Sequence, residues 1–248
     1  MIWANKKVGG WIENDGLDES PAFFEKYEII KVKAYPEIKD TICPACGEKV
    51  IPKCGSIKTW HFAHESLKDC DSFSEPESEW HIGWKNEFPK EQQEVVVEFM
   101  GEKHRADILL ENTKQEPWGK QNYHLIIELQ NSSISLEEVR EREEFYDNMI
   151  WLFNGETFAK GLNLRRKDII TFRWKNPPKI MWYARKSINI HLKGKIGISY
   201  FNGEYIFLNG EYIFQIKKIY PKCPCGGWGV LLTKEQFLKR MKDGAEED

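Results

Sequence analysis

The sequence predicts a protein of the α+β or α/β class, with a core of helices and strands between a small cysteine- and histidine-bearing module and a β-rich C-terminal domain. Three observations carry this prediction. The segment up to Ser74 is rich in turn residues and holds close Cys and His pairs. The central segment shows the pattern helix, three strands, helix, strand, and short strand patterns with turn signals follow Pro178. We therefore expect domains at 1–74, 75–175 and 176–248, in a chain of 248 residues that is long enough for several cores.

The core elements are expected in a fixed order. Glu75 and Pro76 mark the start of the first helix, because proline fits the first turn and acidic side chains there favour the helix dipole. Ser135 is expected to cap the second helix, and Asn154-Gly155 to end the last strand. The expected ranges are 75–89 for the first helix, 94–99, 105–110 and 123–130 for three strands, 136–147 for the second helix and 149–153 for the last strand.

Beyond the core, the hexapeptide Asn-Gly-Glu-Tyr-Ile-Phe occurs twice, at 202–207 and 209–214. Asn-Gly is a strong signal for a tight hairpin turn, so both copies predict hairpins in a small β-rich appendage. Cys223-Pro224-Cys225 lies in the same part of the chain. A turn with two buried thiols is favoured there over a metal site, although the pair could also donate to a metal.

Charge is unevenly distributed along the chain. Residues 158–248 hold 18 Lys+Arg against 8 Asp+Glu, a net +10, whereas 1–157 hold 18 against 31, a net −13. A basic surface attracts nucleic-acid phosphates without regard to sequence. An ordinary solvated face explains the same count equally well.

No apolar run in the sequence is long enough to span a membrane, and the N-terminus lacks the apolar stretch of a signal peptide. We therefore expect a cytoplasmic protein with no membrane partner. Six cysteines are too few for a disulfide scaffold in a chain of this length, so reduced thiols, some of them on a metal, are expected. The sequence leaves the oligomeric state and protein partners open.

A zinc site is predicted in the first module. Cys43 and Cys46 followed by His61 and His64 have the pairing of a structural zinc site, since thiolate and imidazole are the usual tetrahedral ligands. Two further cysteines, Cys54 and Cys70, lie close enough to compete as ligands. The alternative is that the two histidines pack against the core.

Two carboxylates stand in otherwise apolar strand runs. Side chains alternate along a strand, so Glu128 and Gln130 share a face opposite to that of their neighbours, and Asp107 faces away from Ala106 and Ile108. A carboxylate buried in such a run is costly unless something pairs with it. The pair Asp107 and Glu128 therefore indicates a site for a hard cation such as Mg²⁺. The competing interpretation is a strand-end Asp and a salt-bridged Glu.

The ordered motifs of residues 43–153 resemble the competence protein CoiA-like family, within the PD-(D/E)XK nuclease superfamily. The motifs are Cys43-Pro44-Ala45-Cys46, His61-Phe62-Ala63-His64, Glu77-Ser78-Glu79-Trp80-His81 followed by Lys85, Arg105-Ala106-Asp107, Glu128-Leu129-Gln130-Asn131-Ser132, and Arg142 with Tyr146.

The resemblance implies a restriction-endonuclease-like core in which Asp107 and Glu128 bind a catalytic Mg²⁺ or Mn²⁺. Glu77, His81 and Lys85, spaced four apart on one helix face, are expected to complete the site. The implied activity is a metal-dependent deoxyribonuclease that hydrolyses the phosphodiester bonds of DNA, in DNA uptake and recombination or in defence against foreign DNA.

One departure from the superfamily pattern is Gln130, which stands where most members place a lysine. A glutamine amide can orient a water but carries no positive charge. Lys85 is a substitute for that charge. A catalytically inactive nucleic-acid-binding module with the same fold is the main alternative, and an interaction subunit with purely structural carboxylates is a third. Arg142 and Tyr146, four residues apart on the second helix, either contact phosphate or stabilise that helix.

Overall fold

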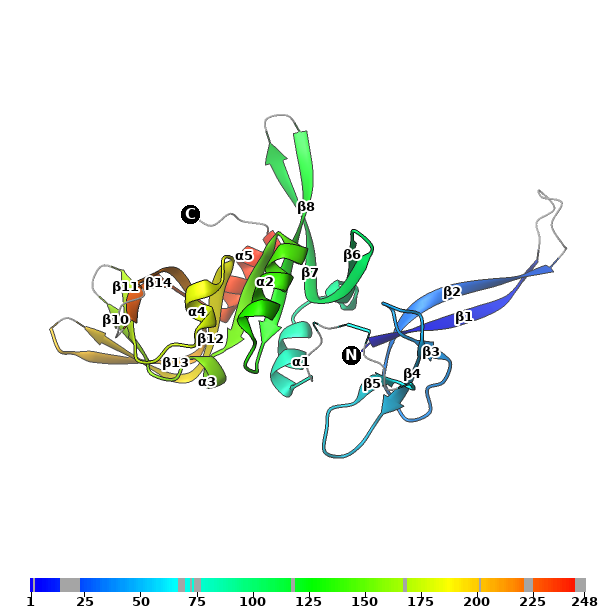
Figure 1. Cartoon of the computed structure of the whole chain (residues 1–248), viewed down its shortest axis with the longest axis horizontal. Helices are drawn as coiled ribbons and strands as arrows, with labels where there is room; N and C mark the ends of the chain where they lie inside the picture. Colours follow the sequence, from blue (N-terminus) through cyan, green and yellow to red (C-terminus); the bar gives the residue numbers. More distant parts are fainter. Residues whose placement is uncertain are drawn as a thin grey trace. The chain divides into compact units, whose positions relative to one another are not determined.

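The computed structural model describes residues 1, 3–13, 23–66, 70–71, 73, 77–116, 119–166, 169–200, 202–220 and 225–243 (Figure 1). The chain forms two compact units. The first comprises Met1–Glu79 with Val96–Arg105, and the second Trp80–Val95 with Ala106–Asp248. The expected helix start at Glu75-Pro76 and the Cys223-Pro224 turn lie outside the described residues.

The first unit is built on an antiparallel sheet of five strands, in the order β2-β1-β3-β4-β5. A small core lies at its centre, formed by buried residues that include Cys43, Val50 and Phe62. Asp71 fastens the segment after the sheet, because its carboxylate accepts hydrogen bonds from the backbone N–H groups of Phe73 and Arg105. The strands are β1 (Trp3–Glu13), β2 (Phe23–Lys33), β3 (Thr41–Ile42), β4 (Lys49–Lys53) and β5 (His61–His64).

A nine-stranded sheet runs through the second unit, in the order β10-β11-β14-β13-β12-β9-β8-β7-β6. β7 and β8 are antiparallel, and β8, β9 and β12 are parallel neighbours. Its strands are β6 (Gln93–Phe99), β7 (Glu102–Glu116), β8 (Gly119–Gln130), β9 (Met149–Asn154), β10 (Leu162–Arg166), β11 (Ile170–Trp174), β12 (Ser187–Tyr200), β13 (Tyr205–Tyr220) and β14 (Cys225–Thr233).

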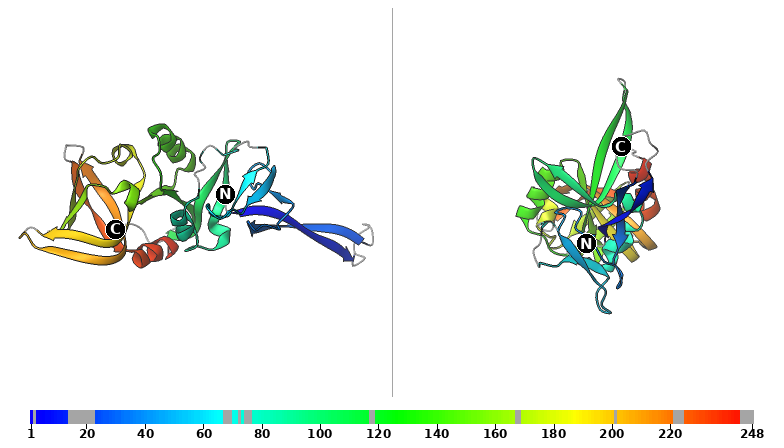
Figure 2. Two further views of the ribbon diagram at one scale, coloured as in Figure 1. Left: turned by 90° about the horizontal axis from the view of Figure 1, so that it is seen from below. Right: turned by 90° about the vertical axis from the view of Figure 1, so that its right-hand side faces the viewer.

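Helices cover both faces of this sheet. α2 lies against one face, and α1 and α5 against the other, as Figures 1 and 2 show. The face with α1 and α5 holds a continuous core that includes Trp84, Ile127, Leu152 and Phe237. The helical segments are α1 (Glu79–Lys85), η1 (Lys90–Gln92), α2 (Leu136–Tyr146), α3 (Gly155–Phe158), α4 (Ile180–Tyr183) and α5 (Lys234–Asp243). Within the described ranges, no helix is both long and apolar enough to cross a membrane.

The mixed α and β class is confirmed, and the central elements α1, β6, β7, β8, α2 and β9 follow in the expected order. The cap of α2 is also confirmed. Ser135 Oγ accepts a hydrogen bond from the N–H of Glu138, and the Glu138 carboxylate accepts one from the N–H of Ser135. This reciprocal pair satisfies two backbone donors that the first turn of a helix leaves open. Helix α1 is shorter than expected and ends at Lys85.

The C-terminal strands continue the core sheet. β12 pairs in parallel with β9, and β10 pairs with both β11 and β12, which joins β10, β11, β14, β13 and β12 in a closed ring of strands. The expected boundary at 175/176 therefore does not separate two compact units in the described structure. The reason is that β12 satisfies the backbone hydrogen bonds along the edge of β9, which a separate domain would leave open.

The two Asn-Gly signals have different outcomes. Asn202-Gly203 makes the β12–β13 turn, where Gly203 has a φ of 87° and Asn202 Oδ1 accepts a hydrogen bond from the N–H of Glu204. The second copy is not a turn. Asn209 and Gly210 lie inside β13, opposite Lys195 and Gly194 of β12, because the register set by the first turn carries the pairing past them.

Candidate functional site

Asp107 and Glu128 meet where the pairing of β7 and β8 ends. The ladder pairs Ile108 with Ile127, and one further step in the same register places Asp107 opposite Glu128. At this position the side-chain carboxylates, instead of backbone carbonyls, accept the hydrogen bonds between the two strands. Asp107 Oδ2 accepts a hydrogen bond from the N–H of Leu129 at 3.0 Å, and Glu128 Oε1 accepts one from the N–H of Asp107 at 3.3 Å. Directly opposite residues of an antiparallel pair share a face, so this end of the ladder holds both acidic side chains.

Helix α1 brings a buried lysine to Asp107. Lys85 Nζ lies 2.9 Å from Asp107 Oδ1 and 3.2 Å from Glu94 Oε1, and only 1% of the lysine side chain is exposed. Glu94, the second residue of β6, has a φ of 47° and is not among the predicted site residues. Glu94 directly precedes the apolar run Val95–Val97. A carboxylate next to an apolar strand run is the same pattern that indicated Asp107 and Glu128, so this pattern could have identified Glu94 as well.

His81 lies one helical turn before Lys85 on α1. Its Nε2 lies 3.2 Å from the carbonyl oxygen of Leu129, so Nε2 carries the proton and donates it. The ring is buried. Two of the three predicted α1 residues therefore reach the end of the β7–β8 ladder.

The pKa of Asp107 is lowered despite its burial. Desolvation acts to raise the pKa, but the charges of Lys85 and His81 and the hydrogen bonds from Lys85 and the Leu129 N–H outweigh it. Asp107 is therefore ionised at neutral pH, which is the form that a metal ligand requires.

A second cation, carried by α2, pairs with Glu128. Arg142 of α2 donates from one guanidinium nitrogen to Glu128 Oε2 at 3.0 Å, and both side chains are almost completely buried. Arg142 is thus a partner of a predicted metal ligand. Tyr146, one turn later, is buried. Sequence spacing alone could not identify this contact, because it joins two elements.

Gln130 is fully buried on the same face of β8 as Glu128. Its side-chain nitrogen donates to the backbone carbonyl of Ser132 at 2.9 Å. That bond fixes the amide at the end of β8. The position carries no charge, and a lysine ammonium, that of Lys85 on α1, lies beside Asp107 instead.

The carboxylates at this end of the ladder are oxygen donors, the ligand type that a hard divalent cation takes. Mg²⁺ takes oxygen ligands and is usually held by one or two carboxylates together with waters. Asp107 accepts two hydrogen-bonding contacts from Lys85 and Leu129, and an ionised carboxylate offers about four lone-pair sites. Its side chain is 20% exposed, so solvent reaches it.

A second candidate metal site lies in the first unit. Ligand atoms of three cysteines and one histidine all lie within 4.8 Å of one another, and the four residues are Cys43, Cys46, His64 and Cys70. The Cys43 and Cys70 sulfurs are 3.6 Å apart, and Cys46 Sγ lies 3.3 Å from His64 Nε2. A disulfide needs an S–S distance of about 2.05 Å, whereas two thiolates on one tetrahedral zinc lie about 3.8 Å apart. The cluster therefore fits a structural metal such as zinc.

The electrostatics of the thiols also favour a bound metal ion at this cluster. Burial raises the pKa of Cys70, and the neighbouring Cys46 and Cys43 thiols raise it further. Several thiolates in one small space repel one another, and a divalent cation removes that penalty.

One predicted zinc ligand is replaced. His61 is outside the cluster, and Cys70 takes its place. The physical reason is strand alternation. His61 and His64 lie three residues apart on β5, and residues separated by an odd number point to opposite faces of a strand. His61 Nδ1 instead lies 2.7 Å from the Thr59 carbonyl oxygen, to which it donates.

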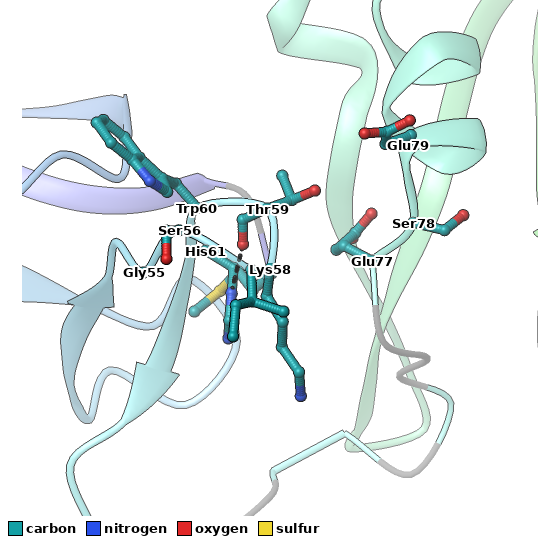
Figure 3. Close-up of a pocket in the computed structure, with 11 residues that line it drawn as sticks. Gly55, Ser56, Lys58, Thr59, Trp60, His61, Glu77, Ser78 and Glu79 are labelled. Atoms are coloured by element: carbon teal, nitrogen blue, oxygen red, sulfur yellow. Dashed lines mark hydrogen bonds between the residues drawn. The ribbon is translucent and has the colours of Figure 1, made fainter.

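His61 and Glu77, expected in two different metal sites, both line a pocket of the first unit. Figure 3 shows His61 turned back to Thr59, and Glu77 on the segment that leads into α1. The pocket is also lined by residues 55–60, 78 and 79. The expected participation of Glu77 in the Asp107 site stays a prediction.

The remaining thiols lie elsewhere. Cys54 is half-buried beside the core of the first unit, and Cys225 is buried at the start of β14. No disulfide joins the described cysteines.

Comparison with models of protein families gives a match in the N-terminal part of the chain. Residues 26–73 match the family model of the N-terminal domain of competence protein CoiA. This range contains all four residues of the Cys₃His cluster. The resemblance to the CoiA-like family is thereby confirmed over these residues. No curated protein and no solved structure matches the chain.

Proposed function

We propose that this chain, whose N-terminal part matches the CoiA family, is a Mg²⁺-dependent deoxyribonuclease with a restriction-endonuclease-like core. The match to a competence-protein domain favours a role in the uptake or recombination of DNA, and defence against foreign DNA is the related alternative. The observation that carries the proposal is the position of Asp107 and Glu128 across the open end of the β7–β8 ladder, with Lys85 on the Asp107 carboxylate.

The element order supports the core assignment. A helix, three strands, a helix and a strand are arranged with β7 and β8 antiparallel and β8 and β9 parallel. This is the order that the resemblance implies. The acidic pair lies on the second and third of these strands, as the same resemblance implies.

Each side chain of the ladder end has a defined part in the proposed reaction. Asp107 and Glu128 would hold the metal, and the lowered pKa of Asp107 keeps its carboxylate ionised. When bound, Mg²⁺ would polarise the scissile phosphate and lower the pKa of an attacking water. Lys85 supplies a fixed positive charge beside Asp107, suited to stabilise the phosphate as negative charge develops. Gln130 and His81, both buried, would help to orient water or phosphate at the site.

The Cys₃His cluster has a separate role in this proposal. Four ligands leave no open coordination position for a substrate, so a zinc ion there would be structural. It would hold β4, β5 and the segment around Cys70 together in a unit whose apolar core is small.

Cleavage assays with matched variants test the proposal. The full chain would be incubated with linear duplex, circular duplex and single-stranded DNA in Mg²⁺ or Mn²⁺. Asp107→Asn and Glu128→Gln preserve side-chain size but weaken metal binding, so both are expected to reduce cleavage to background. Glu111→Gln removes an exposed carboxylate from the same strand β7 and is expected to cleave like the wild type.

The contradicting outcome is equal cleavage by Asp107→Asn and by the wild type. Thermal melts of all variants separate loss of a ligand from loss of the fold, because Asp107 also pairs with buried Lys85. A variant that melts like the wild type but does not cut supports the site.

A second candidate is a catalytically inactive nucleic-acid-binding module. The observation in its favour is that both carboxylates already have cationic partners, Lys85 and Arg142, while Gln130 replaces the usual lysine. Salt-sensitive DNA binding without metal-dependent cutting would establish this candidate in place of the first. Absence of DNA binding at low salt would reject both.

A further inference from the structure

Two aromatic rings lie exposed on the β12–β13 hairpin, which Figures 1 and 2 show in yellow and orange. The side chains of Tyr205 and Phe207 are 59% and 54% exposed, and they lie two residues apart on β13, so they share one face. Their ring centroids are 6.1 Å apart, with 36° between the ring planes. Aromatic side chains are enriched at binding surfaces, and two that lie together on one exposed face can form such a surface.

A glycine below the rings lets them lie across the neighbouring strand. Gly197 of β12 pairs with Phe207. A Cβ atom at Gly197 would lie 3.4 Å from carbon atoms of both rings, so the two aromatics cover the bare backbone of this residue. More than half of the surface of each aromatic residue stays exposed.

Positive charge adjoins the rings. Lys195 Nζ lies 4.0 Å from the centroid of the Phe207 ring, and Lys195 and Lys193 are both exposed on β12. The surrounding region, residues 158–248, carries a net charge of +10. Aromatic faces beside ammonium groups match the two parts of a nucleotide, a base with two flat faces and a phosphate.

We propose that Tyr205 and Phe207, lying over Gly197 beside Lys195, form a stacking platform for the unpaired bases of single-stranded DNA. Bases inside a duplex stack at about 3.4 Å along each strand, with their faces covered. Rings 6.1 Å apart require neighbouring bases to separate before each can stack on its own ring. Only a single strand offers that freedom at little cost. The proposal rests on DNA as the substrate of the proposed function, but not on cleavage.

Fluorescence anisotropy with labelled oligothymidine, in EDTA and at low salt, tests the platform. Tyr205→Ala and Phe207→Ala are each expected to weaken binding about tenfold, because stacking on one aromatic ring contributes roughly this factor. Tyr183→Ala is the matched control, since Tyr183 is a 51% exposed aromatic on α4 of the same unit. It is expected to bind oligothymidine like the wild type.

An abasic oligonucleotide of the same length separates stacking from charge. It keeps the phosphates but has no bases, so the wild type, Tyr205→Ala and Phe207→Ala are expected to bind it equally. Phe207→Leu keeps an apolar side chain over Gly197 without a ring, and it is expected to lose oligothymidine binding as Phe207→Ala does while melting like the wild type. Lys195→Gln is expected to weaken binding to both oligonucleotides.

Three results would overturn the proposal. These are unchanged oligothymidine binding by Tyr205→Ala and Phe207→Ala, equal weakening on the abasic strand, and absence of oligothymidine binding by the wild type. Failure of the nuclease proposal gives a different result, because a protein that does not cut DNA in Mg²⁺ would still show ring-dependent binding in EDTA.

Discussion

Among single residues, His191 of β12 links α1 to the C-terminal strands. The indole N–H groups of Trp80 and Trp84 both donate to its Nδ1, at 2.9 and 3.2 Å. Nδ1 must therefore be unprotonated, and the ring proton lies on Nε2, 3.7 Å from a carboxylate oxygen of Glu211. The two tryptophans occupy one side of α1, so this histidine holds the helix that carries His81 and Lys85.

The environment of His191 favours the neutral ring. Burial lowers its pKa from the usual 6.5 to about 4; the Glu211 carboxylate opposes this shift, and Lys234 and Lys193 add to it. A protonated Nδ1 would also lose both indole donors.

Acid is therefore expected to destabilise the protein through His191. Because the unfolded chain takes up a proton near pH 6.5 and the folded one only near pH 4, the neutral ring stabilises the fold above about pH 6.5, and this contribution is lost as the pH falls towards 4. The expected loss between pH 7 and pH 5 is about 2 kcal/mol in the free energy of unfolding. Urea denaturation at the two pH values measures it.

His191→Gln is the control for this prediction, because a glutamine oxygen can accept an indole hydrogen bond but does not titrate. The variant is expected to be less stable than the wild type at pH 7 and to lose about 2 kcal/mol less on going to pH 5. An equal loss in both proteins would show that His191 does not cause the pH dependence.

At the scale of elements, strand β5 presents His64 and not His61 to the three thiols. The alternation of side chains along the four residues of β5 thus decides which of the two histidines belongs to the cluster. Cys70, which the sequence offers as a competing ligand together with Cys54, comes from beyond the strand and lies 3.6 Å from the Cys43 sulfur.

Metal content is expected to depend on Cys70 and not on His61. Cys70→Ser removes one of four ligands, so zinc measured in the purified protein is expected to fall well below one ion per chain, with a lower melting temperature. His61→Ala is the matched control and is expected to retain its zinc. The opposite pattern would restore His61 as the ligand.

The start of α2 is stabilised by the reciprocal bonds of Ser135 and Glu138. Helix α2 also carries Arg142 to Glu128. The cap therefore supports the element that orients one proposed metal ligand.

Ser135→Ala is expected to reduce the free energy of unfolding by about 1 kcal/mol, because it removes a bond to an otherwise open N–H group. Denaturant titration measures this change. Ser133→Ala, an exposed serine two residues earlier, is expected to have a much smaller effect. Equal effects of the two substitutions would contradict the role of the cap.

At the scale of the whole molecule, the second unit depends on chain segments far apart in sequence. β9 lies between β8 and β12, and its six residues are all buried. Phe237 of α5 packs edge-on against Trp84 of α1, with ring centroids 6.0 Å apart. The C-terminal segment thus completes the core beneath the proposed active site.

A chain that ends at Lys175 is therefore expected not to fold cooperatively. It would expose the edge of β9 and the apolar surface under α5, which favours aggregation. Thermal melts and limited proteolysis of this shortened chain test the expectation. A cooperative transition at the temperature of the full chain would show instead that residues 176–248 form a separate domain.

The sequence by itself determined the features whose causes lie within a few residues. Ser135 with Glu138 marks the helix start, and Asn202-Gly203 marks a turn. The apolar runs with embedded Asp107 and Glu128 indicate buried strands with costly charges. Each of these signals depends on local backbone geometry or on alternation along one strand, so each can be read without knowledge of the fold.

Only the tertiary structure decided the partners of these residues. Lys85 pairs with both Asp107 and Glu94, Arg142 pairs with Glu128, and Cys70 joins the thiol cluster. These contacts join different elements, so they follow from sheet register and packing and not from spacing along the chain. The continuity of β9 with β12 has the same origin, because a strand edge can be satisfied by any segment that the rest of the core brings beside it.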